Sequence, residues 1–398
     1  MSNTEPVYYF DSNATTRVAP EVVAAMLPLL TEQWGNPSSA YRFGHQVGGL
    51  LETAREQVAA LINADPREII FTSCGTESSN AALQSALTTQ PGKRHIVMTA
   101  VEHSANIKYG QLLEKRGCEV TRLPVDSLGE LDVHLLHESI RPDTAIVSVM
   151  TANNETGVIF PIEEIAAICR SKGVPFHTDA VQAPGKLKLD VRAWGVDFLS
   201  LSAHKLHAPK GIGLLYARRG MPFQPFVVGG GQEQGRRAGT ENTAYIVAFG
   251  CAAQRAQESL TRDVPRIRVL RDRLEAGILS SISGVTRNGA KEPRLANTSN
   301  LSFADCEAEA VLLLLDRAGI CASSGSACTT GSLAPSHVLT AMGRTPTQAL
   351  GAVRFSLCQY STDAEVNYLL AKLPDLIKTL RGSIPTAQRP AVQSAAST

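Results

Sequence analysis

The chain has 398 residues, of which 38 are lysine or arginine and 37 are aspartate or glutamate, so its formal net charge is +1. This near-neutral balance gives no global electrostatic field that would favour nucleic acid or an anionic membrane as a partner. A hydrophobic content of 43% with 19% charged residues is typical of a globular protein with a large core, and the length predicts two domains.

The sequence predicts neither a membrane span nor a resident metal site. The longest purely aliphatic run, AVLLLL at residues 310–315, is much shorter than a bilayer-spanning helix. The first residues lack the basic and then apolar regions of an export signal, so we expect a cytoplasmic protein. The eight cysteines form no CxxC pair and no zinc-type or cluster-type spacing, and disulfides are not expected in a reducing compartment.

Residues 68 to about 216 alternate short apolar strands with helical patterns. Continuous apolar strands separated by helices predict an α/β fold, in which a mainly parallel sheet is covered by helices on both faces. The predicted strands are EIIFTSC (68–74), HIVMTAVEH (95–103), TAIVSVMTANN (144–154), VPFHTDAVQ (174–182), DFLSLSAHK (197–205) and GIGLLYARR (211–219).

A second, smaller unit follows a long helical region that begins after residue 242. Its pattern predicts an α+β domain, with strands TSNLSF (298–303), ICASS (320–324) and AVRFSL (352–357) and helices at 307–319, from Ser336 and at 363–380. We therefore divide the chain into an N-terminal segment (1–20), a large domain (21–260), a small domain (261–381) and a disordered tail (382–398).

Polar residues gather where the predicted strands of the large domain end. Ligands of such sheets bind beyond the carboxyl ends of the strands, so we expect these side chains to share one site. The residues are Gly75 and Thr76, Glu102 and His103, Asn153 and Asn154, Asp179 and Gln182, and Ser202, His204 and Lys205.

This set of side chains suits pyridoxal phosphate. Backbone N–H groups at a helix N-terminus, with Thr76, Ser202 and His204, would hold a phosphate. An amine at a strand end beside a phosphate site, here Lys205, points to a lysine that forms a Schiff base with that cofactor. A carboxylate at Asp179 would keep the pyridine nitrogen protonated.

Each of these residues also has an ordinary structural interpretation. Lys205 could be a surface lysine, His103 a hydrogen-bonded core imidazole and Asp179 a helix cap. Lys210 is a competing amine, although its Pro-Gly turn favours a structural or solvent-facing role. The functional hypothesis therefore depends on the joint occurrence of the residues at consecutive strand ends.

One thiol lies in an unusual setting. Cys328 is in the polar, glycine-containing stretch SSGSACTTGS (323–332), which is predicted to be a mobile loop, whereas free cysteines are usually buried. Nothing in this loop could bury the thiol. The alternative to a buried, structural cysteine is a reactive one.

The order of motifs resembles the cysteine desulfurases, pyridoxal-phosphate enzymes of fold type I with the aspartate-aminotransferase-like fold. Within the family the long cysteine loop, TSCGTES and HKLHAPKG are similar to the nitrogen-fixation type, NifS. The motifs run from about residue 8 to residue 360 and are DSNATT (11–16), TSCGTES (72–78), VEHSA (101–105), ANNETG (152–157), HTDAVQ (177–182), SLSAHKLHAPKG (200–211), RRAGTEN (236–242), SSGSACTTGSLAPSH (323–337) and VRFSL (353–357).

The resemblance implies a role for each matched residue. Lys205 would carry the cofactor, His103 would stack on its ring, and Cys328 would receive the sulfur; these three are the expected catalytic residues. Arg354, Asn154 and Asn13 would contact the substrate, with the Arg354 fork suited to its carboxylate. The implied cofactor-binding residues are Gly75, Thr76, His103, Asn154, Asp179, Gln182, Ser202, Ala203, His204, Lys205 and, from the partner subunit of a homodimer, Thr240.

The implied reaction converts L-cysteine to L-alanine and leaves a persulfide on Cys328, which passes sulfur to an iron–sulfur scaffold protein and could transiently ligate a shared cluster. Two residues of the N-terminal segment, beside the implied substrate entrance, depart from the family pattern: Ser12 replaces a common Asn and Arg17 a common Pro. Open alternatives are a selenocysteine lyase or an aminotransferase of the same fold, with Cys328 incidental. A protein that binds a metal or cluster is a further class, but no metal-ligand spacing supports it.

Overall fold

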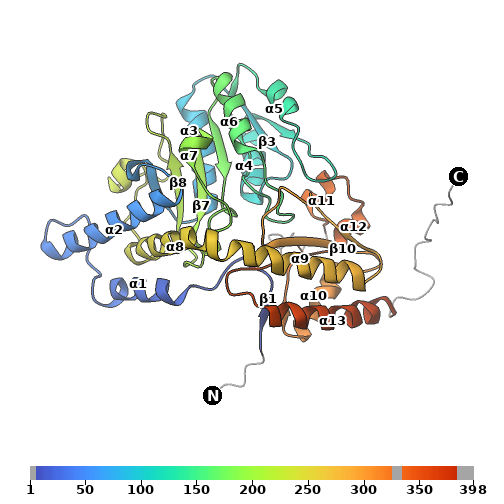
Figure 1. Cartoon of the computed structure of the whole chain (residues 1–398). Coiled ribbons are helices and arrows are strands. Elements are labelled where there is room, and N and C mark those ends of the chain that lie inside the picture. The colour runs from blue at the N-terminus through green and yellow to red at the C-terminus, as the bar shows by residue number, and fades with distance from the viewer. Residues whose placement is uncertain (1–5, 325–333, 383–398) are drawn as a thin grey trace.

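The computed structural model describes residues 6–324 and 334–382. A large sheet with helices on both faces forms the upper part of the molecule in Figure 1, and a smaller sheet with long helices lies below it. The predicted loop around Cys328 and the predicted tail, apart from Gly382, lie outside the described residues.

The large sheet has seven strands in the order β2-β8-β7-β6-β5-β3-β4. Its pairs from β7 to β4 are parallel, whereas β8 runs antiparallel to both β2 and β7. The prediction of a mainly parallel sheet covered by helices is therefore confirmed. The strands are β2 (Ile69–Thr72), β3 (His95–Thr99), β4 (Glu119–Leu123), β5 (Thr144–Ser148), β6 (Phe176–Asp179), β7 (Phe198–Ser202) and β8 (Gly213–Ala217).

These strands are buried on both faces, which explains their continuous apolar character. All five residues of β3, β5, β7 and β8 are buried. The helices that accompany the sheet are α1 (Pro20–Thr31), α2 (Arg42–Leu61), α3 (Gly75–Thr89), α4 (Ser104–Lys115), α5 (Val133–Ser139), α6 (Ile162–Ser171), α7 (Val191–Trp194) and α8 (Thr243–Arg262), with the short 3₁₀ turns η1 (Pro66–Glu68), η2 (Ala203–Lys205) and η3 (Gln232–Gly235).

The carboxyl ends of four strands lie along one edge of this sheet. The strands β5, β6 and β7 are mutually parallel, and β2 runs the same way because β8 is antiparallel to both β2 and β7. The turns after these strands therefore face the same space, and α3 and η2 begin there. This is the geometric basis of the site.

The smaller unit has its own hydrophobic core, which includes Phe303, Val353 and Phe355. The antiparallel sheet at its centre has the order β12-β10-β9. Its elements are α9 (Val264–Ser281), β9 (Val285–Arg287), β10 (Thr298–Phe303), α10 (Ala308–Arg317), β11 (Ile320–Cys321), α11 (His337–Ala341), α12 (Pro346–Leu350), β12 (Ala352–Ser356) and α13 (Asp363–Gly382).

The N-terminal segment joins this smaller unit, a pairing that the sequence did not indicate. Strand β1 (Tyr8–Tyr9) pairs in parallel with β11, and Asp11 forms a further parallel bridge to Ser356 of β12. Phe10 of this segment packs into the core of the smaller unit, and Ala19 packs into a core of the large domain.

Among the described residues, no helix combines the length and the apolar character needed to cross a bilayer. The same ranges contain no group of three or more His, Cys, Asp or Glu side chains arranged to bind a metal ion.

Candidate active site

A cavity of about 360 Å³ lies at the carboxyl edge of the large sheet, between that sheet and β12. Its walls come from the N-terminal segment, from the turns after β2, β3, β5, β6 and β7, and from Arg354. The lining residues are Asn13, Ala14, Cys74, Gly75, Thr76, His103, Met150, Ala152, Asn154, Asp179, Val181, Gln182, Ser202, His204, Lys205 and Arg354.

Most of the candidate residues meet in this cavity, and five do not: Glu102 and Asn153 are buried outside its lining, and the other three are Ala203, Thr240 and Cys328. The Ala203 side chain is fully buried in the hydrophobic core beside the site. Thr240 is exposed and lies outside the cavity wall. Cys328 lies outside the described residues. The candidates that line the cavity are Asn13, Gly75, Thr76, His103, Asn154, Asp179, Gln182, Ser202, His204, Lys205 and Arg354.

The amine of Lys205 is directed at the N-terminal segment. Lys205 ends the turn η2, which follows β7 directly, and its Nζ donates hydrogen bonds to the backbone carbonyls of Asn13 and, at 2.7 Å, of Ala14. The half-buried side chain therefore spans the floor of the cavity.

One end of the cavity is built to bind an anion. The N-terminus of α3, a helix of 15 residues, contributes Gly75 and Thr76, whose backbone N–H groups have no acceptor within the helix. A Cβ at Gly75 would come within 2.8 Å of the Val181 side chain, so only glycine allows this close approach. Ser202 adds a hydroxyl to the same wall.

His204 lies beside this anion-binding end. Its Nδ1 is 3.1 Å from the Thr15 hydroxyl. Burial, together with the nearby Lys205 ammonium, lowers the pKa of His204 to about 4. The imidazole is therefore neutral near pH 7 and contributes a hydrogen bond but no charge.

Asp179 ends β6 on the opposite wall and is 7% exposed. Burial raises the pKa of its carboxyl, while His103, the Val181 N–H at 3.0 Å and Lys205 act in the opposite direction. A cationic ring nitrogen placed against this carboxylate would restore its charged form.

His103 is the N-cap of α4. Its Nδ1 accepts a hydrogen bond from the Ala105 N–H at 3.2 Å, and the ring lines the cavity. The cap fixes the position of the imidazole relative to the helix.

Arg354 extends from β12 into the cavity wall with its side chain 3% exposed. Its Nη2 donates to Asp11 Oδ1 at 2.7 Å and its Nη1 to the Asn154 carbonyl at 3.0 Å. Its Nε, by contrast, has no hydrogen-bond partner among the described residues. A ligand carboxylate would therefore share the Arg354 guanidinium with the carboxylate of Asp11.

The sequence did not single out several residues that form or support the site. Ala14, Cys74, Met150, Ala152 and Val181 line the cavity. Ala14, Cys74, Ala152 and Val181 lie inside motifs that carry the family resemblance, so that signal was available. Asp11 also lies in such a motif, but its contact with Arg354 spans 343 residues of sequence, and no local signal predicts that contact.

Glu102, directly before His103, is fully buried behind the cavity. Its Oε1 accepts hydrogen bonds from the Thr99 hydroxyl at 2.7 Å and the Met150 N–H at 2.9 Å. Burial nevertheless raises the pKa of this carboxyl to about 7.

We expect Glu102→Gln to stabilise the protein above pH 7 and to change its stability little near pH 4.5. The carboxyl pKa rises from 4.5 to about 7 on folding. The wild type therefore loses stability as the pH rises through this window, by roughly 3 kcal/mol in total. Thermal melts of both proteins at pH 5 and pH 8 measure the difference, and an equal effect at the two pH values would contradict it.

Comparisons with known proteins agree with this geometry. The family model for class-V aminotransferases matches residues 8–369. Cysteine desulfurase 2 of Trichormus variabilis is 55% identical over 379 residues, which cover 95% of either chain. Cysteine desulfurase NifS of Azotobacter vinelandii is 50% identical over 378 residues, which cover 95% of this chain and 94% of that protein. The chain belongs to the cysteine desulfurase family, within the class-V aminotransferases.

Solved structures of this family have the same fold. A NifS-like protein superposes with a TM-score of 0.89 at 38% identity and covers 94% of this chain and 100% of its own. A structure described as SspA in complex with cysteine gives a TM-score of 0.80 at 34% identity, covering 89% of this chain and 99% of its own.

Cysteine desulfurases and the wider class-V family depend on pyridoxal phosphate, and the cavity fits that cofactor. The helix N-terminus of α3 with Ser202 and His204 suits a phosphate, and Lys205 supplies an amine. Burial raises the pKa of the Asp179 carboxyl, and a pyridinium nitrogen placed against it would favour its charged form. These residues therefore match the phosphate, the group that reacts with an amine and the ring nitrogen of the cofactor.

Proposed function

We propose that this protein is a pyridoxal-phosphate-dependent cysteine desulfurase. The observation that carries the proposal is the single cavity in which an amine (Lys205), a buried carboxylate (Asp179), a helix N-terminus and a buried arginine (Arg354) meet. The relative solved with cysteine supports the choice of substrate.

The residues that would hold the cofactor follow from their positions. Gly75, Thr76, Ser202 and His204 would bind its phosphate, and the Lys205 amine would attach it covalently. The Asp179 carboxylate would accept the hydrogen bond of the ring nitrogen, with His103 stacked on the ring and Gln182 and Asn154 near its oxygen substituent. When bound, the cofactor withdraws electrons from the substrate and weakens bonds at its α- and β-carbons.

The substrate would be held by its carboxylate. Arg354 lies in the cavity wall with a guanidinium already oriented by Asp11, and Asn13 and Asn154 line the same cavity. The Lys205 amine would move the substrate α-proton within the cavity.

Cys328 would receive the sulfur. Its thiol and L-cysteine would give L-alanine and a Cys328 persulfide: the carbon–sulfur bond breaks, a sulfur–sulfur bond forms, and the thiol proton remains in the products. A thiol has an ordinary pKa of ~8.5, so only a small fraction of it is thiolate at neutral pH. The proposal therefore includes removal of the Cys328 thiol proton by His103.

Both flanks of the segment that carries Cys328 lie next to the cavity. Before it, Ser323 pairs with Arg354 through backbone hydrogen bonds of 3.2 and 2.6 Å. After it, the Ser336 hydroxyl donates to Glu155 at 2.5 Å, and His337 Nε2 lies 2.9 Å from the Glu102 carbonyl. These contacts of the flanking residues support a role for the segment in the chemistry of this cavity.

We further propose a cytoplasmic homodimer that delivers sulfur to an iron–sulfur scaffold protein. The exposed Thr240 is available to complete the phosphate site of a second copy. Helix α1 exposes Val23, Leu27 and Leu30, apolar side chains that a second copy could cover. The domain boundary proposed near residue 260 is supported by the end of α8 at Arg262, after which α9 packs into the second core.

The deciding experiment supplies the protein with pyridoxal phosphate, L-cysteine and a reducing thiol. We expect equal amounts of alanine and sulfide, without need of a 2-oxo acid. Alanine formation that requires a 2-oxo acid would instead identify an aminotransferase, and turnover of selenocysteine alone would identify a selenocysteine lyase.

A further inference from the structure

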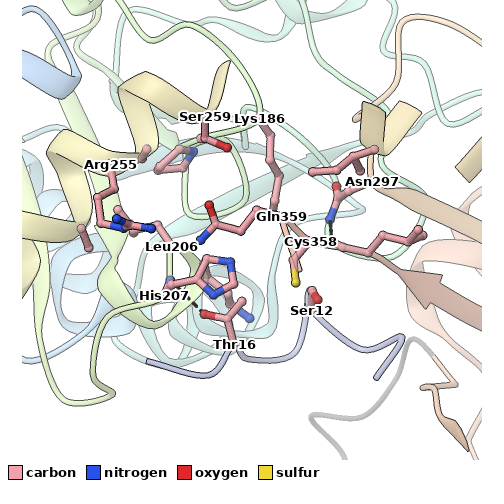
Figure 2. A pocket seen from close by; sticks show the side chains of 17 residues that line it. Ser12, Thr16, Lys186, Leu206, His207, Arg255, Ser259, Asn297, Cys358 and Gln359 are labelled. Carbon is pink, nitrogen blue, oxygen red and sulfur yellow. Dashed lines mark hydrogen bonds between the residues drawn. The ribbon is translucent and has the colours of Figure 1, made fainter. Parts of the chain in front are cut away.

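A lysine outside the active-site cavity donates a hydrogen bond to a side chain that lines it. Gln182 lines the active-site cavity, whereas Lys186 lines a second, smaller cavity of about 50 Å³ (Figure 2). Lys205 lines both cavities. The Lys186 Nζ donates a hydrogen bond to Gln182 Oε1 at 3.1 Å. This bond therefore crosses the wall between the two cavities.

The two ends of the Gln182 amide are fixed by partners that cannot exchange roles. The Lys186 ammonium can only donate and therefore requires the amide oxygen, whereas the Asn13 carbonyl can only accept, whatever the charge of Lys186, and binds Nε2 at 3.0 Å. A flipped amide would lose both bonds. Because Nε2 has two N–H groups, one is left for an acceptor in the active-site cavity.

The backbone holds Lys186 in place. Gly185 has φ +69°, and its Cα faces Ala256 of α8, where an added Cβ would lie 3.4 Å from the alanine Cβ. The Lys186 N–H donates to the Ala183 carbonyl at 3.0 Å. This turn directs the half-buried lysine side chain back toward Gln182.

The charge of Lys186 is not needed for this contact. Burial, with Lys205 and Arg354 nearby and Cys358 opposing them, brings the pKa of Lys186 to about 7. Both the ammonium and the neutral amine carry N–H groups, so the hydrogen bond to Gln182 persists in either form.

We propose that Lys186 is a positioning residue that locks the Gln182 amide so that its remaining N–H donates to the oxygen substituent on the cofactor ring. This inference rests on the proposed function, because it assigns that ring to the active-site cavity. A hydrogen-bond donor at this oxygen favours the deprotonated form of the bound cofactor. Loss of Lys186 therefore raises the pH at which the visible absorption band of the bound cofactor changes.

The test measures this spectral titration in the purified enzyme loaded with pyridoxal phosphate. We expect Lys186→Met to raise the transition by about one pH unit, the effect of one hydrogen bond. Gln182→Ala should raise it by a similar amount, and Lys186→Arg, which keeps a donor, should restore most of the wild-type value. Lys188→Met, at an exposed lysine two residues away, is the matched control and should leave the transition unchanged.

The double variant Gln182→Ala/Lys186→Met separates positioning from a simple charge effect. If Lys186 acts through Gln182, the double variant shifts no further than Gln182→Ala alone. Additive shifts, or an unchanged transition in Lys186→Met, would overturn the inference while leaving the proposed function intact. A wild type that binds no cofactor would instead overturn the proposed function, and this assignment with it.

Discussion

Lys205→Ala is expected to abolish alanine formation from L-cysteine, with a loss of about 10³- to 10⁴-fold or more. The reason is that this amine would both attach the cofactor and move the substrate α-proton, and no other lysine lines the active-site cavity among the residues that the structure describes. Borohydride reduction followed by mass spectrometry should find the cofactor covalently attached at residue 205 in the wild type and absent from the variant.

Lys210→Ala provides the matched control for this prediction. Lys210 follows in the same loop but is exposed and lies outside the cavity wall. Its replacement should leave both the attached cofactor and the rate near wild type. Attachment at residue 210, or a Lys205→Ala enzyme that retains its activity, would contradict the assignment.

Cys328→Ala is expected to reduce sulfur release and alanine formation to below about one thousandth of the wild-type rate, while the bound cofactor keeps its spectrum. The variant lacks the thiol that would accept sulfur but keeps the cavity in which the cofactor would bind. Alanine from L-cysteine and persulfide on the protein, detected by alkylation and mass spectrometry, measure the two halves of the reaction.

Cys321→Ala tests whether any nearby thiol serves equally well. Cys321 lies on β11, seven residues before Cys328, and burial raises the pKa of its thiol. We expect this variant to retain wild-type turnover and persulfide. Undiminished alanine formation by Cys328→Ala would exclude the persulfide mechanism and favour an aminotransferase or selenocysteine lyase.

The strand-end residues could be predicted because their arrangement follows from a local rule. Parallel strands place their carboxyl ends on one edge, so Gly75, Asp179 and Lys205 had to meet once the apolar strands were recognised. Asp179 is the last residue of β6, and Gly75 and Lys205 lie in the turns that follow β2 and β7. The family resemblance then supplied their expected chemical roles.

Other features depend on contacts between distant parts of the chain. The pairing of β1 with β11 brings the N-terminal segment over the site, where the Asn13 carbonyl accepts from Lys205 and Gln182. A strand of two residues is too short to show a periodic pattern that would predict this pairing. Ala203 shows the opposite case, because a motif position expected at the cofactor packs into the hydrophobic core.

By itself, the sequence determined the α/β class, the edge of the sheet that carries the site, and the identity of most residues that line it. Each of these follows from short-range pattern: apolar runs, turns and the residue after each strand. Only the tertiary structure decided that Asp11 accepts a hydrogen bond from Arg354 and that Lys186 donates one to Gln182. Such partners are selected by distance in space and by donor–acceptor chemistry, which the order of residues along the chain does not encode.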